Sequence, residues 1–156
     1  MKTLTIETPI KVYAYDELNT EERKLTESAL EATHRSYAPY SNFHVGAAVM
    51  LDNGIIVTGN NQENVAFPSG LCAERTALFY ANAQYPEVPV KALAIVARDS
   101  SGKVTQTPIS PCGACRQVMV ETEKRFGKPM KVLLCGAEEV YVAESASSLL
   151  PLSFDF

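Results

Sequence analysis

The sequence predicts an α/β fold, a three-layer α/β/α sandwich with a mixed sheet of about five strands. An Asn-Gly pair at 53–54 lies between two apolar runs, which is a strong signal for a β-hairpin. Beyond this pair, stretches with apolar residues at helical spacing alternate with continuous apolar runs that are typical of buried strands. Helices that alternate with strands in this way cover both faces of one sheet.

The first elements follow an N-terminal extension, residues 1–18, to which the sequence assigns no role. Residues 3–13 alternate loosely between apolar and polar and predict an edge strand, which Pro9 limits. Asn19 and Glu22 have the spacing of a capping box, and the helix that they begin continues until an Ala-Pro pair ends the pattern.

The other predicted elements are bounded by turn residues and by changes in apolar spacing. They are strands at 44–51 and 55–59, a polar loop at 60–70, a helix from Cys72 to near Pro86, a buried strand at 90–97, a helix from Pro111 or Cys112 to Gly127, strands at 130–135 and 140–143, and a helical turn and tail from 147.

Length and composition favour one compact domain, residues 1–156. The chain is 46% apolar, and a chain of its length buries roughly two thirds of its unfolded surface. Its net charge of −4 argues against a nucleic-acid surface, which usually carries a basic stripe. No run approaches the roughly 18 apolar residues of a membrane span, and the first ten residues lack a signal-peptide pattern. We therefore expect a cytoplasmic protein with no nucleic-acid or membrane partner.

Two motifs that are far apart in the sequence are expected to meet at one edge of the sheet. If strands 55–59 and 90–97 run in the same direction, the helices that follow them begin at the edge where ligands collect. This arrangement brings Cys72 beside Cys112.

Three cysteines have the spacing of a zinc site. Cys112 and Cys115 lie in the first turn of one helix, so both sulfurs can face one point while the helix N-terminus favours thiolates. Cys72 would add a third ligand, and three protein ligands with one open position are typical of catalytic zinc. Disulfides are disfavoured in the cytoplasm, so the four cysteines are better explained as metal ligands, catalytic thiols or core residues than as a disulfide framework.

Charged and polar residues lie next to these cysteines. Zinc with three thiolates carries one net negative charge, which opposes the acidification of water that metal-assisted hydrolysis needs. Arg75 is our candidate for offsetting that charge, and Arg116 and Gln117 are further donors. Glu74 lies close to the metal without being a ligand, where it could carry protons between water and substrate.

A structural zinc centre is the alternative interpretation, with Cys135 as a fourth thiolate. Cys135 lies in an apolar run without a partner at metal spacing, so we expect a buried core thiol. A redox Cys-x-x-Cys would not explain Glu74 or Arg75. His34 and His44 also have no spaced partner and are expected to be ordinary surface and strand residues.

The stretches CAERTA at 72–77 and PCGACRQ at 111–117 closely resemble the zinc-dependent cytidine deaminases, specifically the small homotetrameric class with three cysteine ligands. The resemblance extends from about 37 to 154, through YAPYSNFHVGAA, NNQEN and LLPLSF. It implies a cytidine deaminase-like fold, one Zn²⁺ per subunit, and the known chemistry of zinc deaminases with its non-ligand glutamate. The implied reaction converts cytidine and 2′-deoxycytidine to uridine and 2′-deoxyuridine with release of ammonia, in pyrimidine salvage.

The resemblance also implies roles for individual residues, including an aromatic side chain that one subunit lends to a neighbour within a homotetramer with shared active sites. These residues are Cys72, Cys112 and Cys115 for zinc, Glu74 for proton transfer, Phe43 for packing on the pyrimidine, Asn61 and Glu63 for the ribose hydroxyls, the Ala73 backbone N–H for the base carbonyl, and Phe154 for the neighbouring site.

Other functions and roles remain open from the sequence. Blasticidin-type deaminases share the three-cysteine site, although Asn61 and Glu63 favour an ordinary ribose. Nucleic-acid editing enzymes share the chemistry, although the acidic balance argues against a groove for a polymer. A structural zinc module would bind metal without turnover, and replacing Glu74 would then have no effect. Phe43 could be an ordinary core residue, and Asn61 a turn residue.

Overall fold

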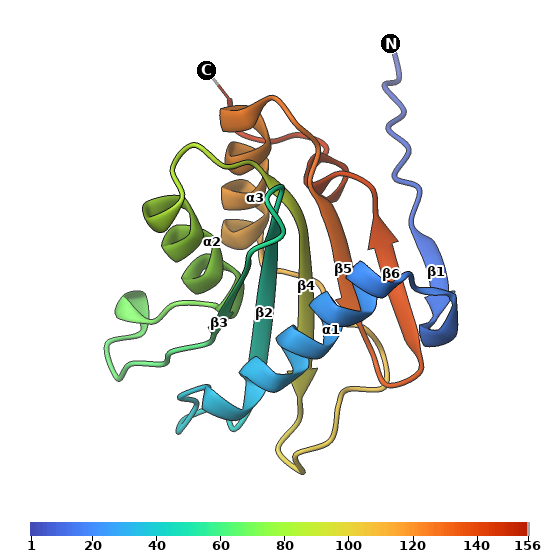
Figure 1. The fold of residues 1–156 in the computed structure, drawn as a ribbon. Coiled ribbons are helices and arrows are strands. Elements are labelled where there is room, and N and C mark those ends of the chain that lie inside the picture. The colour runs from blue at the N-terminus through green and yellow to red at the C-terminus, as the bar shows by residue number, and fades with distance from the viewer. Residues whose placement is uncertain (156) are drawn as a thin grey trace.

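The computed structural model describes residues 1–155, and its centre is a six-stranded mixed sheet in the order β1-β6-β5-β4-β2-β3 (Figure 1). Only β4 and β5 pair in parallel, and the other neighbours are antiparallel. The strands are β1 (Lys11–Ala14), β2 (His44–Leu51), β3 (Ile56–Asn60), β4 (Val90–Arg98), β5 (Lys131–Cys135) and β6 (Glu139–Ala143). The helices are α1 (Thr20–Ala32), α2 (Ala73–Gln84) and α3 (Gly113–Phe126), with short 3₁₀ turns η1 (Tyr15–Glu17), η2 (Thr33–Arg35), η3 (Phe67–Ser69) and η4 (Ala146–Leu149).

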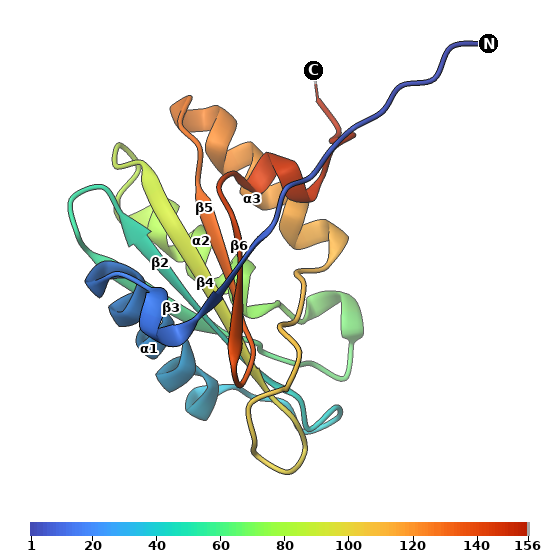
Figure 2. The same ribbon diagram turned by 90° about the vertical axis from the view of Figure 1, so that its right-hand side faces the viewer.

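Helices cover both faces of the sheet, which confirms the predicted three-layer sandwich. Figure 2 shows α1 and α3 on opposite sides of the strands. One buried cluster joins α2 and α3 to the sheet through residues such as Leu78 and Met119, and a second joins α1 through Leu25 and Ala29. In the described part of the chain, no helix combines the length and the apolar character that a membrane span needs.

The sheet has one strand more than the predicted five because β1 pairs antiparallel with β6. The prediction of an edge strand over 3–13 is right for its last residues only, since β1 begins at Lys11. Pro9 limits the strand because it has no N–H to donate to a ladder, and the pairing with β6 runs from Lys11 opposite Val142 to Ala14 opposite Glu139.

The helix α1 begins as predicted, at a capping box. The Asn19 side chain accepts a hydrogen bond from Glu22 N at 3.0 Å, and the Glu22 carboxylate accepts one from Asn19 N at 3.1 Å. The helix crosses β2 at Gly46, where an added Cβ would lie 2.0 Å from the Ala29 carbonyl oxygen. The absence of a side chain at this position therefore lets α1 lie directly on the strand.

The helices α2 and α3 begin at the same edge of the sheet, as predicted. Strands β3 and β4 are both antiparallel to β2, so they run in one direction, and each is followed by one of these helices. Cys72 and Cys112 are the N-cap residues of α2 and α3. At Gly59 on β3, an added Cβ would lie 2.5 Å from the Ala77 nitrogen. This close approach fixes how α2 sits on the sheet.

Candidate active site

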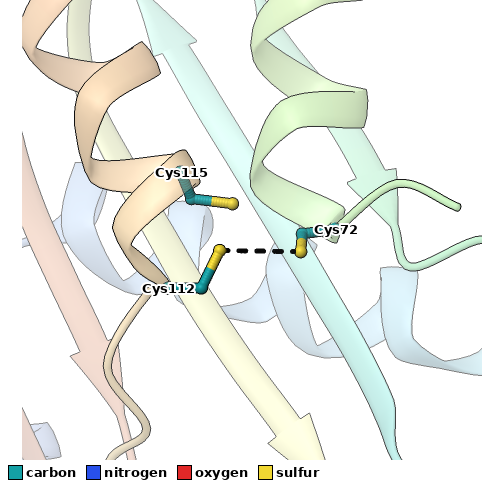
Figure 3. Close-up of side chains that lie close together, drawn as sticks. All are labelled: Cys72, Cys112 and Cys115. Carbon is teal, nitrogen blue, oxygen red and sulfur yellow. Dashed lines mark hydrogen bonds between the residues drawn. The ribbon is translucent and has the colours of Figure 1, made fainter. Parts of the chain in front are cut away.

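Three cysteine sulfurs meet where α2 and α3 begin. The Sγ atoms of Cys72, Cys112 and Cys115 all lie within 4.8 Å of one another, and those of Cys72 and Cys112 are 3.9 Å apart (Figure 3). Neither N-cap cysteine uses its side chain to cap its own helix, so both sulfurs are available to a ligand. The predicted convergence of two distant motifs is confirmed.

The cluster fits a zinc ion. Tetrahedral zinc with sulfur ligands at about 2.3 Å places its sulfurs roughly 3.8 Å apart, close to the spacing found here. Hydrogen bonds from Cys115 and Arg75 lower the pKa of Cys72 to about 5. The hydrogen bond to Cys72 and burial raise the pKa of Cys115. Cys72 thus ionises readily, whereas a second negative charge on the neighbouring Cys115 is unfavourable. A divalent cation bound to the sulfurs would stabilise both charges.

The fourth cysteine lies too far into the fold to close the site. Cys135 is fully buried in the core cluster beneath α1, whereas the other three cysteines lie at the α2 and α3 side of the sheet. All four are free thiols. The prediction of a core thiol at Cys135 is confirmed, and the four-cysteine structural centre is wrong.

Glu74 lies in the first turn of α2, two residues beyond Cys72, with only 4% of its surface exposed. Burial raises the pKa of this carboxyl group, and the negative charge of Cys72 adds to the effect. Arg75 points at the cluster, with Nη2 3.6 Å from the Cys72 sulfur. Its buried Nε has no partner among the described residues. The site therefore combines a buried carboxyl group of raised pKa with a cation beside the sulfur cluster.

A cavity of about 520 Å³ adjoins Cys72 and Arg75. Its lining includes both predicted ribose-binding residues, Asn61 and Glu63, and several residues that the sequence did not single out. The lining residues of the described chain are Tyr40, Ser41, Asn61, Gln62, Glu63, Asn64, Phe67, Gly70, Leu71, Cys72 and Arg75.

Hydrogen bonds hold the Glu63 carboxylate in the wall of this cavity. It accepts from Tyr40 N at 2.9 Å, from Ser41 N at 3.3 Å and from the Ser41 hydroxyl. These bonds, led by that of the Ser41 hydroxyl, lower the pKa of Glu63. The same hydroxyl accepts a hydrogen bond from Phe43 N. Ser41 is thus a residue that the sequence reasoning missed, although its place in the matched YAPYSNFHVGAA stretch was a signal.

Residues 19–127 match the family model of the cytidine and deoxycytidylate deaminase zinc-binding region. The chain belongs to this family. The matched range contains all three clustered cysteines, Glu74 and the cavity wall.

Known deaminases resemble the chain over most of its length. The cytidine deaminase of Halalkalibacterium halodurans is 44% identical over 97 residues, which cover 62% of this chain and 68% of the relative. The crystal structure of the cytidine deaminase from Burkholderia pseudomallei aligns with a TM-score of 0.71 at 44% identity, covering 84% of this chain and 97% of the other. That of the cytidine deaminase from Mycobacterium tuberculosis aligns with a TM-score of 0.67 at 31% identity, covering 88% and 100%.

Within this deaminase site, Asn61 is bound to the main chain of β2. Its side-chain oxygen accepts from Val45 N at 2.8 Å, and its nitrogen donates to the Phe43 carbonyl oxygen at 2.9 Å. Phe43 is half-buried and directly precedes β2. Ala73 is fully buried as the first residue of α2, where backbone N–H groups have no partner within the helix.

Gln117 and Arg116 make other contacts than those predicted. Gln117 donates to the Phe154 carbonyl oxygen at 3.0 Å and accepts from Phe154 N at 3.2 Å. Arg116 donates to the carbonyl oxygens of Pro111 and Leu149. Both side chains thus form hydrogen bonds with main-chain groups. They lie on the side of α3 along which the C-terminal tail passes. The Phe154 side chain itself is 68% exposed.

The two histidines also have partners other than a metal. The His34 ring lies 3.0 Å from an Arg98 nitrogen, and the His44 ring lies 2.6 Å from the Ser36 hydroxyl. A larger cavity of about 750 Å³ lies between α1 and the loop after β4, and none of the clustered cysteines lines it. The smaller cavity, which Cys72 lines, is therefore the one that adjoins the cysteine cluster.

Proposed function

We propose that the chain hydrolyses cytidine and 2′-deoxycytidine to uridine and 2′-deoxyuridine and releases ammonia. The observation that carries this proposal is the three-sulfur cluster with a buried carboxyl group beside it, next to a cavity of nucleoside size. Membership of the deaminase family and the names of the relatives support it. Cytoplasmic pyrimidine salvage is the setting that such a reaction suits.

Cys72, Cys112 and Cys115 would hold the zinc ion. Bound zinc supplies acidity, since it can lower the pKa of water to about 7. Glu74 accepts a proton from the attacking water and passes it to the ring nitrogen beside the carbon that bears the amine. Water oxygen bonds to that carbon as a hydroxyl. Glu74 then takes the remaining proton of this hydroxyl and gives it to the amine as the C–N bond breaks, which leaves a carbonyl and ammonia. A carboxyl group with a raised pKa suits both transfers, because it holds each proton in turn between donor and acceptor.

Positive charge near the sulfurs keeps this chemistry feasible. Arg75 stands beside Cys72, and the N-termini of α2 and α3 both point to the cluster. Together they offset the charge of three thiolates, which would otherwise work against removing a proton from water.

The cavity wall suits the sugar of a nucleoside. The Glu63 carboxylate stays ionised and has acceptor capacity beyond its present bonds, so it can accept a hydrogen bond from a ribose hydroxyl. Asn61 would bond the sugar beside it, Phe43 would pack on the pyrimidine, and the Ala73 N–H would bind the base carbonyl. A site that hydrogen-bonds a substrate hydroxyl strongly rejects analogues without it.

A homotetramer with shared active sites is part of this proposal. Large aromatic side chains are exposed around the cavity and along α2, namely Phe67, Phe79 and Tyr80. A subunit interface would cover such exposed aromatic side chains, which supports the proposal. Phe154 would enter the site of a neighbouring subunit in this assembly.

The test is the ultraviolet absorbance of cytidine, followed with and without a zinc chelator. We expect loss of absorbance that the chelator abolishes. Glu74→Gln should lower kcat by at least about 100-fold while the zinc content is retained. An unchanged rate in Glu74→Gln would refute the proton-transfer role of Glu74, and no turnover by the unmodified zinc protein would leave only metal binding without catalysis. Faster turnover of blasticidin than of cytidine, or competition by single-stranded DNA, would replace the proposed substrate class.

A further inference from the structure

Glu123 is a buried carboxylate that the proposed reaction does not use. It lies in the second half of α3, with 7% of its surface exposed. We infer that Glu123 is a positioning residue that fixes the C-terminal segment, residues 145–155, on the helix that carries Cys112 and Cys115. The inference rests on the proposed function in one respect, that the segment contributes to a deaminase site.

Hydrogen-bond donors fill both oxygens of Glu123. Oε1 accepts from Met130 N and Ala146 N, each at 2.7 Å, and from the Ser145 hydroxyl at 2.9 Å. Oε2 accepts from the hydroxyls of Ser145 and Ser147 and from Ser147 N at 3.0 Å. A buried charge is stable only when it is paired or well hydrogen-bonded. These donors meet that need, and most of them come from the turn that begins the C-terminal segment.

The rest of the segment lies along α3. Arg116 donates to the Leu149 carbonyl oxygen at 2.9 Å, and Gln117 bonds both main-chain groups of Phe154. Lys124 forms an ion pair with Asp155. Among these contacts, the one at Glu123 is the most buried, and it sets the point where the chain leaves β6 for the helix surface. Fixing that point places the segment where Leu149 and Phe154 make their contacts with α3.

The consequence concerns substrate affinity rather than the metal. The cysteines lie at the N-terminus of α3, whereas Glu123 acts near its C-terminus on a different part of the chain. Loosening the segment therefore changes where Phe154 lies and leaves the three sulfurs in place. The expected effect is a higher KM for cytidine with kcat and zinc content preserved.

The experiment compares the full-length zinc protein with Glu123→Gln. This substitution replaces one accepting oxygen by an amide NH₂, which faces hydrogen-bond donors and cannot accept from them. Glu121→Gln is the matched control, since Glu121 is an exposed carboxylate on the same helix. Hydrogen exchange should quicken by about tenfold or more at the amides of 145–149 in Glu123→Gln only. Its KM should rise by about 2- to 10-fold, the range for one lost aromatic contact. If Glu123→Gln does not fold, Ser147→Ala removes one donor and tests the same point.

A double-mutant cycle with Phe154→Ala separates positioning from a general loss of stability. If Glu123 acts through the segment, the double variant has the KM of the more affected single variant. Unchanged exchange at 145–149, KM effects that multiply, or loss of zinc in Glu123→Gln would overturn the inference. If the unmodified protein does not turn over cytidine, the proposed function fails, and the exchange data alone decide whether Glu123 fixes the segment.

Discussion

Replacing Gly59 by alanine should displace the helix that carries Cys72 and Glu74. The new Cβ would lie 2.5 Å from the Ala77 nitrogen and 2.7 Å from the Ala73 carbonyl oxygen, both in the backbone of α2. Ordinary contacts begin near 3.4 Å. The helix must therefore retreat by about 0.9 Å, because backbone atoms cannot rotate away as a side chain can.

This displacement is large compared with what a metal site tolerates. Ligand distances in functional sites hold to within about 0.2 Å, so a shift of this size separates Cys72 from the two cysteines of α3. Overpacking costs about 1–3 kcal/mol, which lowers Tm by roughly 2–12 °C for a chain of this length. A misplacement near 1 Å also lowers the rate by about 100-fold.

The assay combines thermal unfolding, zinc content per folded chain and kcat/KM for cytidine. Gly46→Ala is the matched control, since its Cβ would meet the Ala29 carbonyl oxygen of α1 at 2.0 Å on the opposite face of the sheet. Gly46→Ala should lower Tm but keep zinc, whereas Gly59→Ala should lose both. A Gly59→Ala protein with unaltered zinc and kcat/KM, or equal zinc loss in both variants, would refute the reasoning.

Three further outcomes are expected. Arg75→Gln removes the cation 3.6 Å from the Cys72 sulfur and should lower kcat/KM by about 10- to 100-fold. Kinetics normalised to zinc content measure this change, and an unaltered kcat/KM would contradict the role of Arg75. Iodoacetamide at pH 7 should label Cys72 in chelator-treated protein, because the Cys72 pKa of about 5 lies below that pH. It should spare Cys135, because burial raises the pKa of that thiol to about 12. Peptide mass spectrometry that finds Cys135 labelled first would count against the assignment. Glu63→Gln should raise the KM for cytidine about tenfold or more. In the unmodified protein the pKa of Glu63 is lowered, so the titration of Glu63 should not change the KM between pH 5 and 8. Equal KM values for the two proteins would show that Glu63 does not bind the sugar.

The sequence by itself determined the local elements and the chemistry of the metal ligands. The capping box at Asn19, the hairpin at 53–54 and the stop of α3 at Gly127 all depend on residues a few positions apart. Spacing of this kind is visible without a fold, because a turn or a cap forms from neighbouring backbone groups. The pair Cys112 and Cys115 is local in the same sense.

The meeting of Cys72 with Cys112 followed from the predicted strand directions, but only the tertiary structure decided the other contacts between distant segments. In the fold, β1 pairs with β6 at the edge of the sheet, and Gln117 bonds the Phe154 main chain and not the cysteine sulfurs. The Glu123 carboxylate accepts hydrogen bonds from the turn at 145–147. None of these contacts has a fixed spacing in the sequence. Each exists because backbone donors and acceptors of far segments must be satisfied wherever packing of the core brings them together.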